Sequence, residues 1–526
     1  MNLANIQSPG VYINEVNGFP NSVVPVATAI PAFIGYTPQA LYEGKSYTNV
    51  AQKITSFAEF QAFYCYPEPQ APANPVKQYS PEYYLVKQKS QPDKGDYVQI
   101  DGSYYSIVPD PNTIYYLYNS VRLFYENGGG DAYIVSVGTY GAPTKKPMTP
   151  GTQIVNTNVE LNDLLKGLAI LKNEDEPTMY ICPEATLLTV ANNANLMQEM
   201  LLQNTQMQTA ISIFDIIGGN DPDPILYTND IETFRNSTGA EGLNYGTAYY
   251  PFIETSLMQN TDIDYTNLFG GDLKQLAPII NPADSPNQSV ASILAKIENP
   301  SGTALSIKQG NNALLTASKT YTNIIKHVLS DANTLPPSGG MAGVITTIDN
   351  QVGPWQAPAN TSIVGTAKLP INLSESQQRD LNVDAVSGKS VNAIRKFNGL
   401  GFLIWGARTL DGNSLDWQYL SVRRTLIFIE QSCKLATRAY VFQPNDKNTW
   451  EGVKAMIGGF LTGIWKQGGL EGAVAANAFQ VECGLGSTMT GLDQLKGIMR
   501  VSVKVAVTRP AEFIILTFEQ EMATSS

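Results

Sequence analysis

The sequence has a single histidine in 526 residues, His327, and this scarcity limits the catalytic chemistry open to it. A Ser-His-Asp or Cys-His mechanism would have to use this one imidazole, which lies in the apolar stretch 324–329 beside no nucleophile motif. A metal centre built on histidines is equally unsupported. We therefore expect His327 to be a structural residue, and we expect the chain not to be an enzyme.

Cysteine is almost as scarce, with four residues far apart in the sequence, Cys65, Cys182, Cys433 and Cys483. None forms a Cys-x-x-Cys pair, so we expect buried free thiols rather than a zinc site or a disulfide framework. No apolar run reaches the length that a membrane-spanning helix needs. The first residues lack a secretion signal, so we expect synthesis in the cytoplasm and no direct membrane insertion.

Charge is the third deficit, because charged residues make up 15% of the chain and the net charge is −12. A surface with few charges is easier to desolvate, which suits a subunit that packs into an assembly. The acidic balance argues against nucleic-acid binding. Residues 395–526 form the basic end of this acidic chain, which suits a contact with an acidic partner.

What the sequence does contain is an alternation of strands and helices. Helical spacing occurs at residues 114–126, 161–171 and 193–208, and apolar strand-like runs lie at 29–36, 132–137, 178–182, 210–217 and 401–405. This alternation predicts an α/β fold with a parallel sheet covered on both sides. Two insertions interrupt it, a β element near 65–112 with a hairpin at Asp101-Gly102 and an irregular, weakly helical stretch at 255–334.

The last part of the chain predicts a smaller α+β domain. We expect a long helix over residues 420–440, a second helix from its N-cap Thr449 to Trp465, and strands over 479–483 and 497–507. Lys454 lies on the polar face of the second helix, and Lys466 follows just past its end.

Apolar strands are also predicted at both ends of the chain, over residues 11–16 and 512–520. The side chains concerned are Val11, Tyr12, Ile13, Glu15, Val16, Phe513, Ile514, Ile515, Leu516 and Phe518. A strand at a terminus has unpaired backbone groups along its edges and must join a sheet. The residues alone leave open whether that sheet belongs to the same copy or to a neighbouring one.

Three smaller patterns have simple structural interpretations. The Asn-Gly-Gly-Gly stretch at 127–130 follows a helix and precedes a strand, the reverse of a phosphate-binding loop, which predicts a glycine helix cap. Arg423 and Arg424 are expected to bind carboxylates, either within the subunit or across an interface. Three acidic residues share no recognisable face and are expected at the surface, Asp349, Asp380 and Asp384.

A series of distinctive sequence motifs spans both ends and much of the middle of the chain. They are SPGVYINEV (8–16), AFIG (32–35), VRLFYENGGG (121–130), LPPSGGMAGV (335–344), GPWQAPAN (353–360), WGARTL (405–410), VRR (422–424) and RPAEFI (509–514). Their order and spacing resemble the sheath proteins of contractile phage tails and of related contractile injection systems. The two insertions, 65–112 and 255–334, contain no such motifs.

The resemblance implies a multidomain α/β organisation in four parts. An N-terminal arm would comprise residues 1–28, and an α/β sheath core residues 29–394 with its insertions. A C-terminal α+β inner domain, which faces a tube, would follow over residues 395–510, and residues 511–526 would form a C-terminal arm. In such sheaths the arms are exchanged between neighbouring copies.

The same resemblance implies a structural function without a cofactor or a metal. The subunit would form stacked hexameric rings, a helical cylinder around an inner tube protein, in contact with baseplate and terminator or cap proteins. Contraction would drive the tube through a target membrane, and the particle would act after release from the cell. Lys454 and Lys466 are then candidates for contacts with an acidic tube.

Three alternatives remain open at this stage. Another self-assembling shell protein, such as a capsid or surface-layer subunit, would share the composition. An α/β hydrolase-like enzyme would share the strand–helix alternation. Lys454 and Lys466 are equally consistent with ordinary solvated lysines. The sequence does not distinguish a phage from a bacteriocin or a toxin-injecting system.

Overall fold

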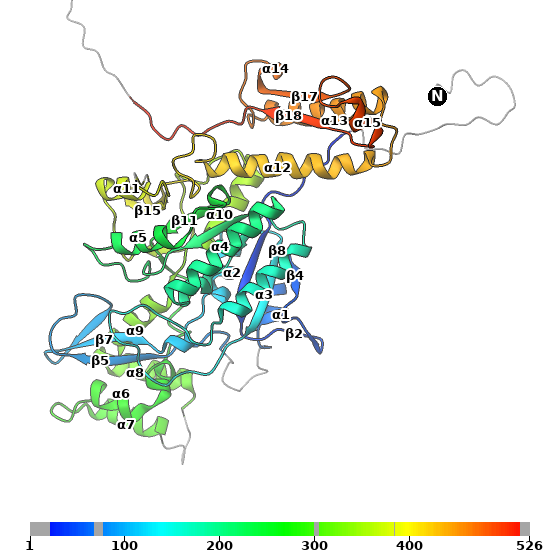
Figure 1. Ribbon diagram of the computed structural model, residues 1–526. Helices are drawn as coiled ribbons and strands as arrows, with labels where there is room; N and C mark the ends of the chain where they lie inside the picture. The colour runs from blue at the N-terminus through cyan, green and yellow to red at the C-terminus, as the bar shows by residue number, and fades with distance from the viewer. Residues whose placement is uncertain (1–21, 68–76, 299–304, 383, 385, 516–526) are drawn as a thin grey trace, which may run out of the picture. The chain divides into compact units, whose positions relative to one another are not determined.

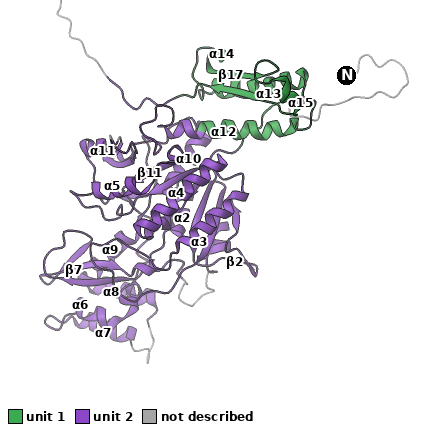
Figure 2. Cartoon of the chain, in the orientation of Figure 1, with its two compact units in different colours: residues 1–26, 425–508 green, residues 27–424, 509–526 purple. Residues whose placement is uncertain are grey.

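The computed structural model describes residues 22–67, 77–298, 305–382, 384 and 386–515. The chain divides into two compact units (Figure 2). The small unit has residues 22–26 and 425–508 among those described, and the large unit has residues 27–424 and 509–515. The large unit contains a mixed eight-stranded sheet covered by helices, which confirms the predicted multidomain α/β class.

The large sheet has the strand order β4-β8-β1-β9-β10-β11-β15-β16. Its six central strands are parallel, whereas β4 and β16 are antiparallel at the two edges. The strands are β1 (Pro31–Thr37), β4 (Ala51–Ile54), β8 (Ala132–Thr139), β9 (Met179–Ile181), β10 (Ile211–Asp215), β11 (Gly246–Tyr250), β15 (Asn392–Phe397) and β16 (Gly401–Ile404). The strands predicted at 29–36, 132–137, 178–182, 210–217 and 401–405 are thus confirmed.

Helices cover this sheet on both faces, as Figure 1 shows. On one face, Phe124 of α2 (Leu117–Glu126) packs edge-on against Phe33 of β1, with ring centroids 5.6 Å apart. On the other, Gly167 of α3 (Leu161–Ile170) lies against Ile34. Because successive strand residues point to opposite faces, α2 and α3 lie on opposite sides of β1. Helix α10 (Ser338–Gln351) packs with α2, and α4 (Val190–Met207) packs with α3.

The two insertions form secondary structure of their own in the large unit (Figure 1). The first is a three-stranded sheet of β5 (Tyr83–Gln88), β7 (Ser103–Pro109) and β6 (Tyr97–Ile100). Its hairpin turns at Asp101 and Gly102, whose φ angles are 45° and 75°, so the predicted turn is confirmed. The second is more helical than predicted, with α6 (Leu273–Ile280), α7 (Gln288–Glu298), α8 (Ile307–Ala317) and α9 (Lys319–Ala332).

Several short elements complete the large unit. They are the hairpin β2 (Leu41–Tyr42) and β3 (Lys45–Ser46), the helices α1 (Phe57–Tyr64), α5 (Thr228–Ser237) and α11 (Glu375–Asn382), and the small sheet of β13 (Thr334–Leu335), β12 (Ile253–Thr255) and β14 (Thr366–Lys368). Strand β15 hydrogen-bonds to β11, so residues 392–397 are part of the large sheet.

The small unit combines helices with a two-stranded antiparallel sheet. Helix α12 (Leu420–Thr437) begins in the large unit and continues into the small one. It is followed by α13 (Lys447–Lys466), α14 (Ala475–Ala478), β17 (Phe479–Cys483), α15 (Gly491–Leu495) and β18 (Val501–Val505).

Two predictions for the C-terminal region need correction. The N-cap of α13 is Asp446 rather than Thr449, because the Asp446 carboxylate accepts a hydrogen bond of 3.0 Å from the Thr449 backbone N–H. The sequence predicts a strand over residues 512–520, but the described part, residues 512–515, is not in a strand. These residues have no neighbouring strand within the described chain to pair with.

Glycines of the SGGMAG motif, residues 338–343, allow α10 to pack unusually close to α2. A Cβ atom at Gly339 would lie 2.5 Å from the carbonyl oxygen of Ser120, and one at Gly343 would lie 2.6 Å from that of Phe124. Side chains at these two positions would therefore push the helix backbones apart. The contact ends at Asn127, where Gly128 adopts a φ of 86° and the N–H groups of Gly128 and Gly129 bond back to α2, so the predicted glycine cap is confirmed.

Two buried carboxylates cap the N-termini of these packed helices. Glu184, which follows β9, accepts hydrogen bonds from the N–H groups of Tyr116 and Leu117 at the start of α2, at 3.3 and 2.8 Å. Asp215, at the end of β10, accepts one of 3.0 Å from the Ser338 N–H at the start of α10. Both helices therefore take their N-terminal caps from the carboxyl ends of sheet strands rather than from their own sequence.

Burial raises the pKa of both carboxyl groups. Desolvation raises the pKa of Glu184 to about 8 and that of Asp215 to about 7, although the helix N–H groups act in the opposite direction. A carboxyl group whose pKa is raised by folding stabilises the fold while it is protonated. For Glu184 this contribution is complete below pH 4.5, its unfolded value, and is lost as the pH rises toward 8.

Glu184→Gln should therefore change the pH dependence of stability. Glutamine keeps the oxygen that accepts the α2 N–H groups and cannot ionise, so the variant should unfold at a higher temperature than the wild type at pH 8.5, with a smaller difference at pH 6. Each tenfold change in the protonation equilibrium corresponds to ~1.4 kcal/mol of folding free energy. Thermal unfolding at both pH values tests this, with the exposed Glu199→Gln as control. A difference that is equal at both pH values would contradict it.

Candidate assembly interface

An apolar groove of about 1070 Å³ lies within the small unit. One side of it is a face of β18, because alternate strand residues point the same way, and the other side is α12. The lining side chains include Val501, Val503 and Val505 from the strand and Leu426, Ile429 and Cys433 from the helix. Such a surface is typical of a site that receives another apolar segment.

Phe442 lies at this groove and is fully exposed. Its φ of 68° places it in the left-handed region, which costs about 1 kcal/mol or more for a residue with a side chain. An exposed aromatic side chain on a strained backbone is a feature of sites that make contacts. Tyr440 and Val441, which precede it, line the same groove.

The sheet beside the groove has only two strands among the described residues. Strands β17 and β18 pair in register from Phe479↔Val505 to Cys483↔Val501, and no further described strand joins either of them. A sheet of two strands leaves a row of unpaired N–H and C=O groups on each outer edge. Its edges can therefore accept strands from elsewhere.

The predicted arm residues are described only in part. Val11, Tyr12, Ile13, Glu15 and Val16, together with Leu516 and Phe518, lie outside the described residues. The three remaining candidates, Phe513, Ile514 and Ile515, belong to the large unit and are 72%, 77% and 89% exposed. A run of three exposed large apolar residues is costly in water and favours burial against a partner.

The two candidate lysines lie apart on α13. Lys454 forms an ion pair of 2.7 Å with Glu451, one turn earlier, whereas Lys466 is exposed at the end of the helix. Gly459 and Gly463 lie one turn apart on α13, between the two lysines in the sequence, and a Cβ atom at either glycine would meet nothing within 4 Å. This face of α13 is open to a close approach by another surface.

Arg424 and Asp349 form a buried ion pair that the sequence did not reveal. Their side chains are 4% and 1% exposed, and Nη2 of Arg424 lies 2.5 Å from Oδ2 of Asp349. Arg424 also donates to the Thr28 carbonyl at 2.9 Å. Arg424 of the VRR motif therefore binds a carboxylate within the subunit rather than across an interface. Asp349, which was expected at the surface, has a buried side chain.

A second ion pair joins two of the sequence motifs, WGARTL and RPAEFI. Arg408 binds Glu512 through Nη2 at 2.6 Å and through Nε at 3.0 and 3.1 Å. Arg423, the other arginine of the VRR motif, stacks over the rings of Trp417 and Tyr245, with its guanidinium carbon 4.7 and 4.8 Å from the ring centroids. The motifs therefore drew attention to the arginines, but their carboxylate partners, Asp349 and Glu512, could not be assigned from sequence spacing alone.

The catalytic alternative finds no support in the surroundings of His327. Its Nδ1 lies 2.6 Å from Oδ2 of Asp96, so the imidazole joins α9 to the loop before β6. All four cysteines are free; Cys65, Cys182 and Cys483 are buried and Cys433 is partly exposed. Within the described ranges, no cluster of three histidine, cysteine or acidic side chains could hold a metal ion, and no helix is long and apolar enough to span a membrane.

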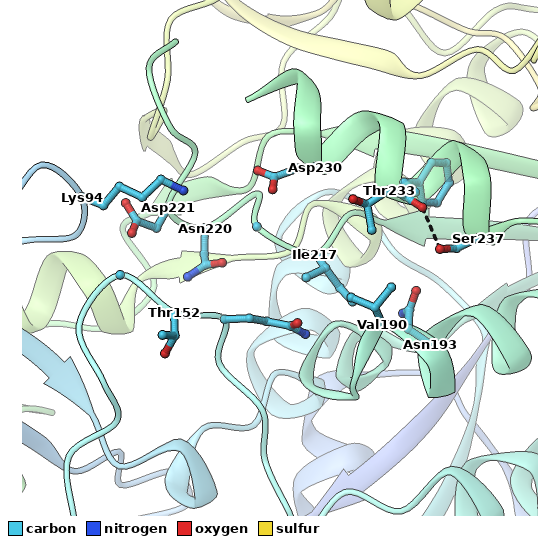
Figure 3. A pocket seen from close by; sticks show the side chains of 14 residues that line it. Lys94, Thr152, Val190, Asn193, Ile217, Asn220, Asp221, Asp230, Thr233 and Ser237 are labelled. Atoms are coloured by element: carbon cyan, nitrogen blue, oxygen red, sulfur yellow. Dashed lines mark hydrogen bonds between the residues drawn. The ribbon is translucent and has the colours of Figure 1, made fainter. Parts of the chain in front are cut away.

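A polar pocket of about 190 Å³ lies in the large unit beyond β10. Figure 3 shows Lys94 directed toward Asp221, with Asp230 nearby. Desolvation raises the pKa of Asp230 to about 6, and Lys94 acts in the opposite direction. The pocket has no nucleophile beside a base, and the crevice between β1 and β9, where open α/β sheets usually bind ligands, contains the side chain of Glu184.

Comparison with known proteins agrees with this geometry. Residues 413–521 match the phage tail sheath C-terminal domain family. A tail sheath protein of Vibrio phage KVP40 is 27% identical over 139 residues, which are 26% of this chain and 20% of the phage protein. The match therefore spans about a fifth of the length of that curated relative.

Two solved structures share the fold over almost the whole chain. The sheath complex of PVC, an extracellular contractile injection system, in its contracted state has a TM-score of 0.57 and 23% identity, with 98% of each chain covered. The contracted helical sheath of the anti-feeding prophage has a TM-score of 0.58 and 23% identity, with 98% and 99% covered. Residues 413–521 are thus similar to the C-terminal domain of phage tail sheath proteins, and the chain shares the fold of these two contractile sheath structures over almost its whole length.

Proposed function

We propose that this protein is the sheath protomer of a contractile injection particle. Copies polymerise as stacked hexameric rings into a helical cylinder around an inner tube, and contraction drives the tube through a target membrane. The observation that carries the proposal is the two-stranded sheet of the small unit, with unpaired edges beside an apolar groove. The tube, baseplate and cap proteins would be its partners in a particle that acts outside the cell that made it.

Strand addition explains why the sheet is incomplete. The segment 513–518 alternates so that Ile514, Leu516 and Phe518 share one face when the segment is extended, and residues 11–13 form a second apolar run. A strand from a neighbouring copy would satisfy the edge N–H and C=O groups and cover the valine face of β18. Backbone pairing of this kind ties subunits together while their bodies move.

The energy source in this proposal is packing. A subunit that can pack in two ways stores the difference in contact free energy between the loose and the tight arrangement. Burial of apolar surface contributes roughly 25 cal/mol per Å². Many copies acting in one cooperative wave then need only a few kcal/mol each, so neither a nucleotide nor another cofactor is part of the mechanism.

Electron microscopy of the purified protein tests the assembly and the N-terminal arm together. The full chain should form hollow striated cylinders, whereas a variant lacking residues 1–17 should stay soluble and folded but form none, because it cannot donate its strand. Circular dichroism is the folding control. Flat sheets or closed shells from the full chain would favour a surface layer or a capsid, and normal cylinders from the truncated chain would show that the arm is dispensable.

Val503→Asp should block the groove without unfolding the subunit. Val503 is half-buried, so the charge is tolerated in water but would be desolvated under an incoming strand, at a cost of several kcal/mol. We expect cylinders to be lost while the thermal unfolding temperature changes little. Lys504→Asp, an exposed position on the same strand, is the matched control. Equal assembly by both variants would remove the groove from the proposed mechanism.

Lys454→Glu combined with Lys466→Glu tests the proposed tube contact. If the open face of α13 seats on an acidic tube, the double variant should bind purified tubes about tenfold more weakly at low salt, and the difference should shrink in high salt. Co-sedimentation measures this, with Lys447→Glu and Lys496→Glu as a control for net charge. Binding that is unchanged at low salt would show that the two lysines are ordinary solvated residues.

A further inference from the structure

After the small unit the chain returns to the large unit, and the half-buried side chain of Glu512 holds it there. After the small unit, residues 509–515 again belong to the large unit. Arg509 is exposed, donates to the Leu415 carbonyl and approaches Asp416 at 3.7 Å, and Phe513 is 72% exposed. Between them, Glu512 is held by three residues of the large unit. The described part of the C-terminal segment therefore passes from a fixed residue to solvent-exposed ones within a single peptide unit.

The contacts of Glu512 have the geometry of a strong anchor. Arg408 grips both carboxylate oxygens in the paired arrangement that gives the strongest ionic hydrogen bonds in proteins. Asn382 donates to Oε1 at 2.9 Å and the Tyr419 hydroxyl to Oε2 at 3.3 Å. These hydrogen bonds lower the pKa of Glu512 despite its desolvation, so the carboxylate is ionised in neutral solution.

Arg408 is in turn fixed to the large sheet. Its side chain is 6% exposed, and its backbone N–H donates to the side chain of Asn392 at 2.8 Å. Asn392 in β15 is fully buried and donates to the Arg408 carbonyl, to the Thr247 hydroxyl and to the Ala248 carbonyl of β11. A continuous path of hydrogen bonds thus leads from Glu512 to two central strands.

We propose that the Arg408–Glu512 pair is the tether through which the C-terminal arm, once bound to a neighbouring copy, pulls on the large sheet. This inference rests on the proposed sheath function and adds the residues that transmit force. Residues beyond Glu512 belong to the contact with the neighbour, whereas residues up to Glu512 move with the large unit.

Stability of the isolated fold does not explain this arrangement as well. A buried ion pair adds little net stability, because the cost of removing both charges from water offsets their attraction. An anchor under tension has a different requirement, namely that the connection resist displacement. Two oxygens gripped by one planar guanidinium, with two further donors, resist sliding in more than one direction.

Glu512→Gln in the full chain tests the tether, with Arg509→Gln as the matched control because it removes a neighbouring charge at an exposed position. A nitroxide label on Ile515→Cys, which is 89% exposed, reports local mobility in the free subunit. Urea dissociation of cylinders reports the strength of the assembly. Arg408→Gln combined with Glu512→Gln leaves no unpaired buried charge and serves if the single variant folds poorly.

The tether predicts that Glu512→Gln increases label mobility and lowers the urea concentration that dissociates cylinders. The double variant, which leaves no unpaired buried charge, should show both effects with an unfolding temperature close to that of the wild type. Arg509→Gln should match the wild type in all three. Unchanged mobility, or increased mobility with cylinders of normal resistance, would overturn the tether alone. If the wild type forms no cylinders, the proposed function falls and the tether falls with it.

Discussion

Two carboxylates in the middle of the large unit hold its covering helices to its sheet. Glu184 and Asp215 lie at the carboxyl ends of two neighbouring parallel strands. The carboxyl group of Glu184 accepts two N–H groups at the start of α2, and that of Asp215 accepts one at the start of α10. A helix start that is buried without such a partner would leave several donors unsatisfied. These two caps fix where α2 and α10 begin, and the glycines of α10 then allow the two helix backbones to touch.

The structure explains the physical role of several sequence motifs through which the chain resembles sheath proteins. The SGGMAG motif forms the close contact between α10 and α2, and the NGGG motif forms the cap that ends α2. The VRR, WGARTL and RPAEFI motifs supply members of two ion pairs, one buried and one partly exposed. These motifs therefore place either a glycine where a side chain would clash or a charged group opposite its partner. The features lie within one subunit, which explains why they form a recognisable framework independent of any partner.

The sequence predicted the regular elements well and the long-range contacts poorly. Strands β1, β8, β9 and β10 and helices α2, α3 and α4 follow from apolar periodicity, which is a local property. The pairs Arg424–Asp349 and Arg408–Glu512 join residues 75 and 104 positions apart, and no local pattern encodes a partner at such a distance. The N-cap of α13 was missed because Asp446 and Thr449 are both good capping residues. The groove was also missed, because it arises only when β18 lies beside α12.

The side chain of Glu184 has one more consequence. In an open α/β sheet, the space beyond β1 and β9 is where nucleotides and other small molecules commonly lodge. Here a residue of the chain itself already fills that space and uses the helix dipole that would attract a phosphate. A phosphate group could reach the first N–H groups of α2 from this side only if the side chain of Glu184 moved away.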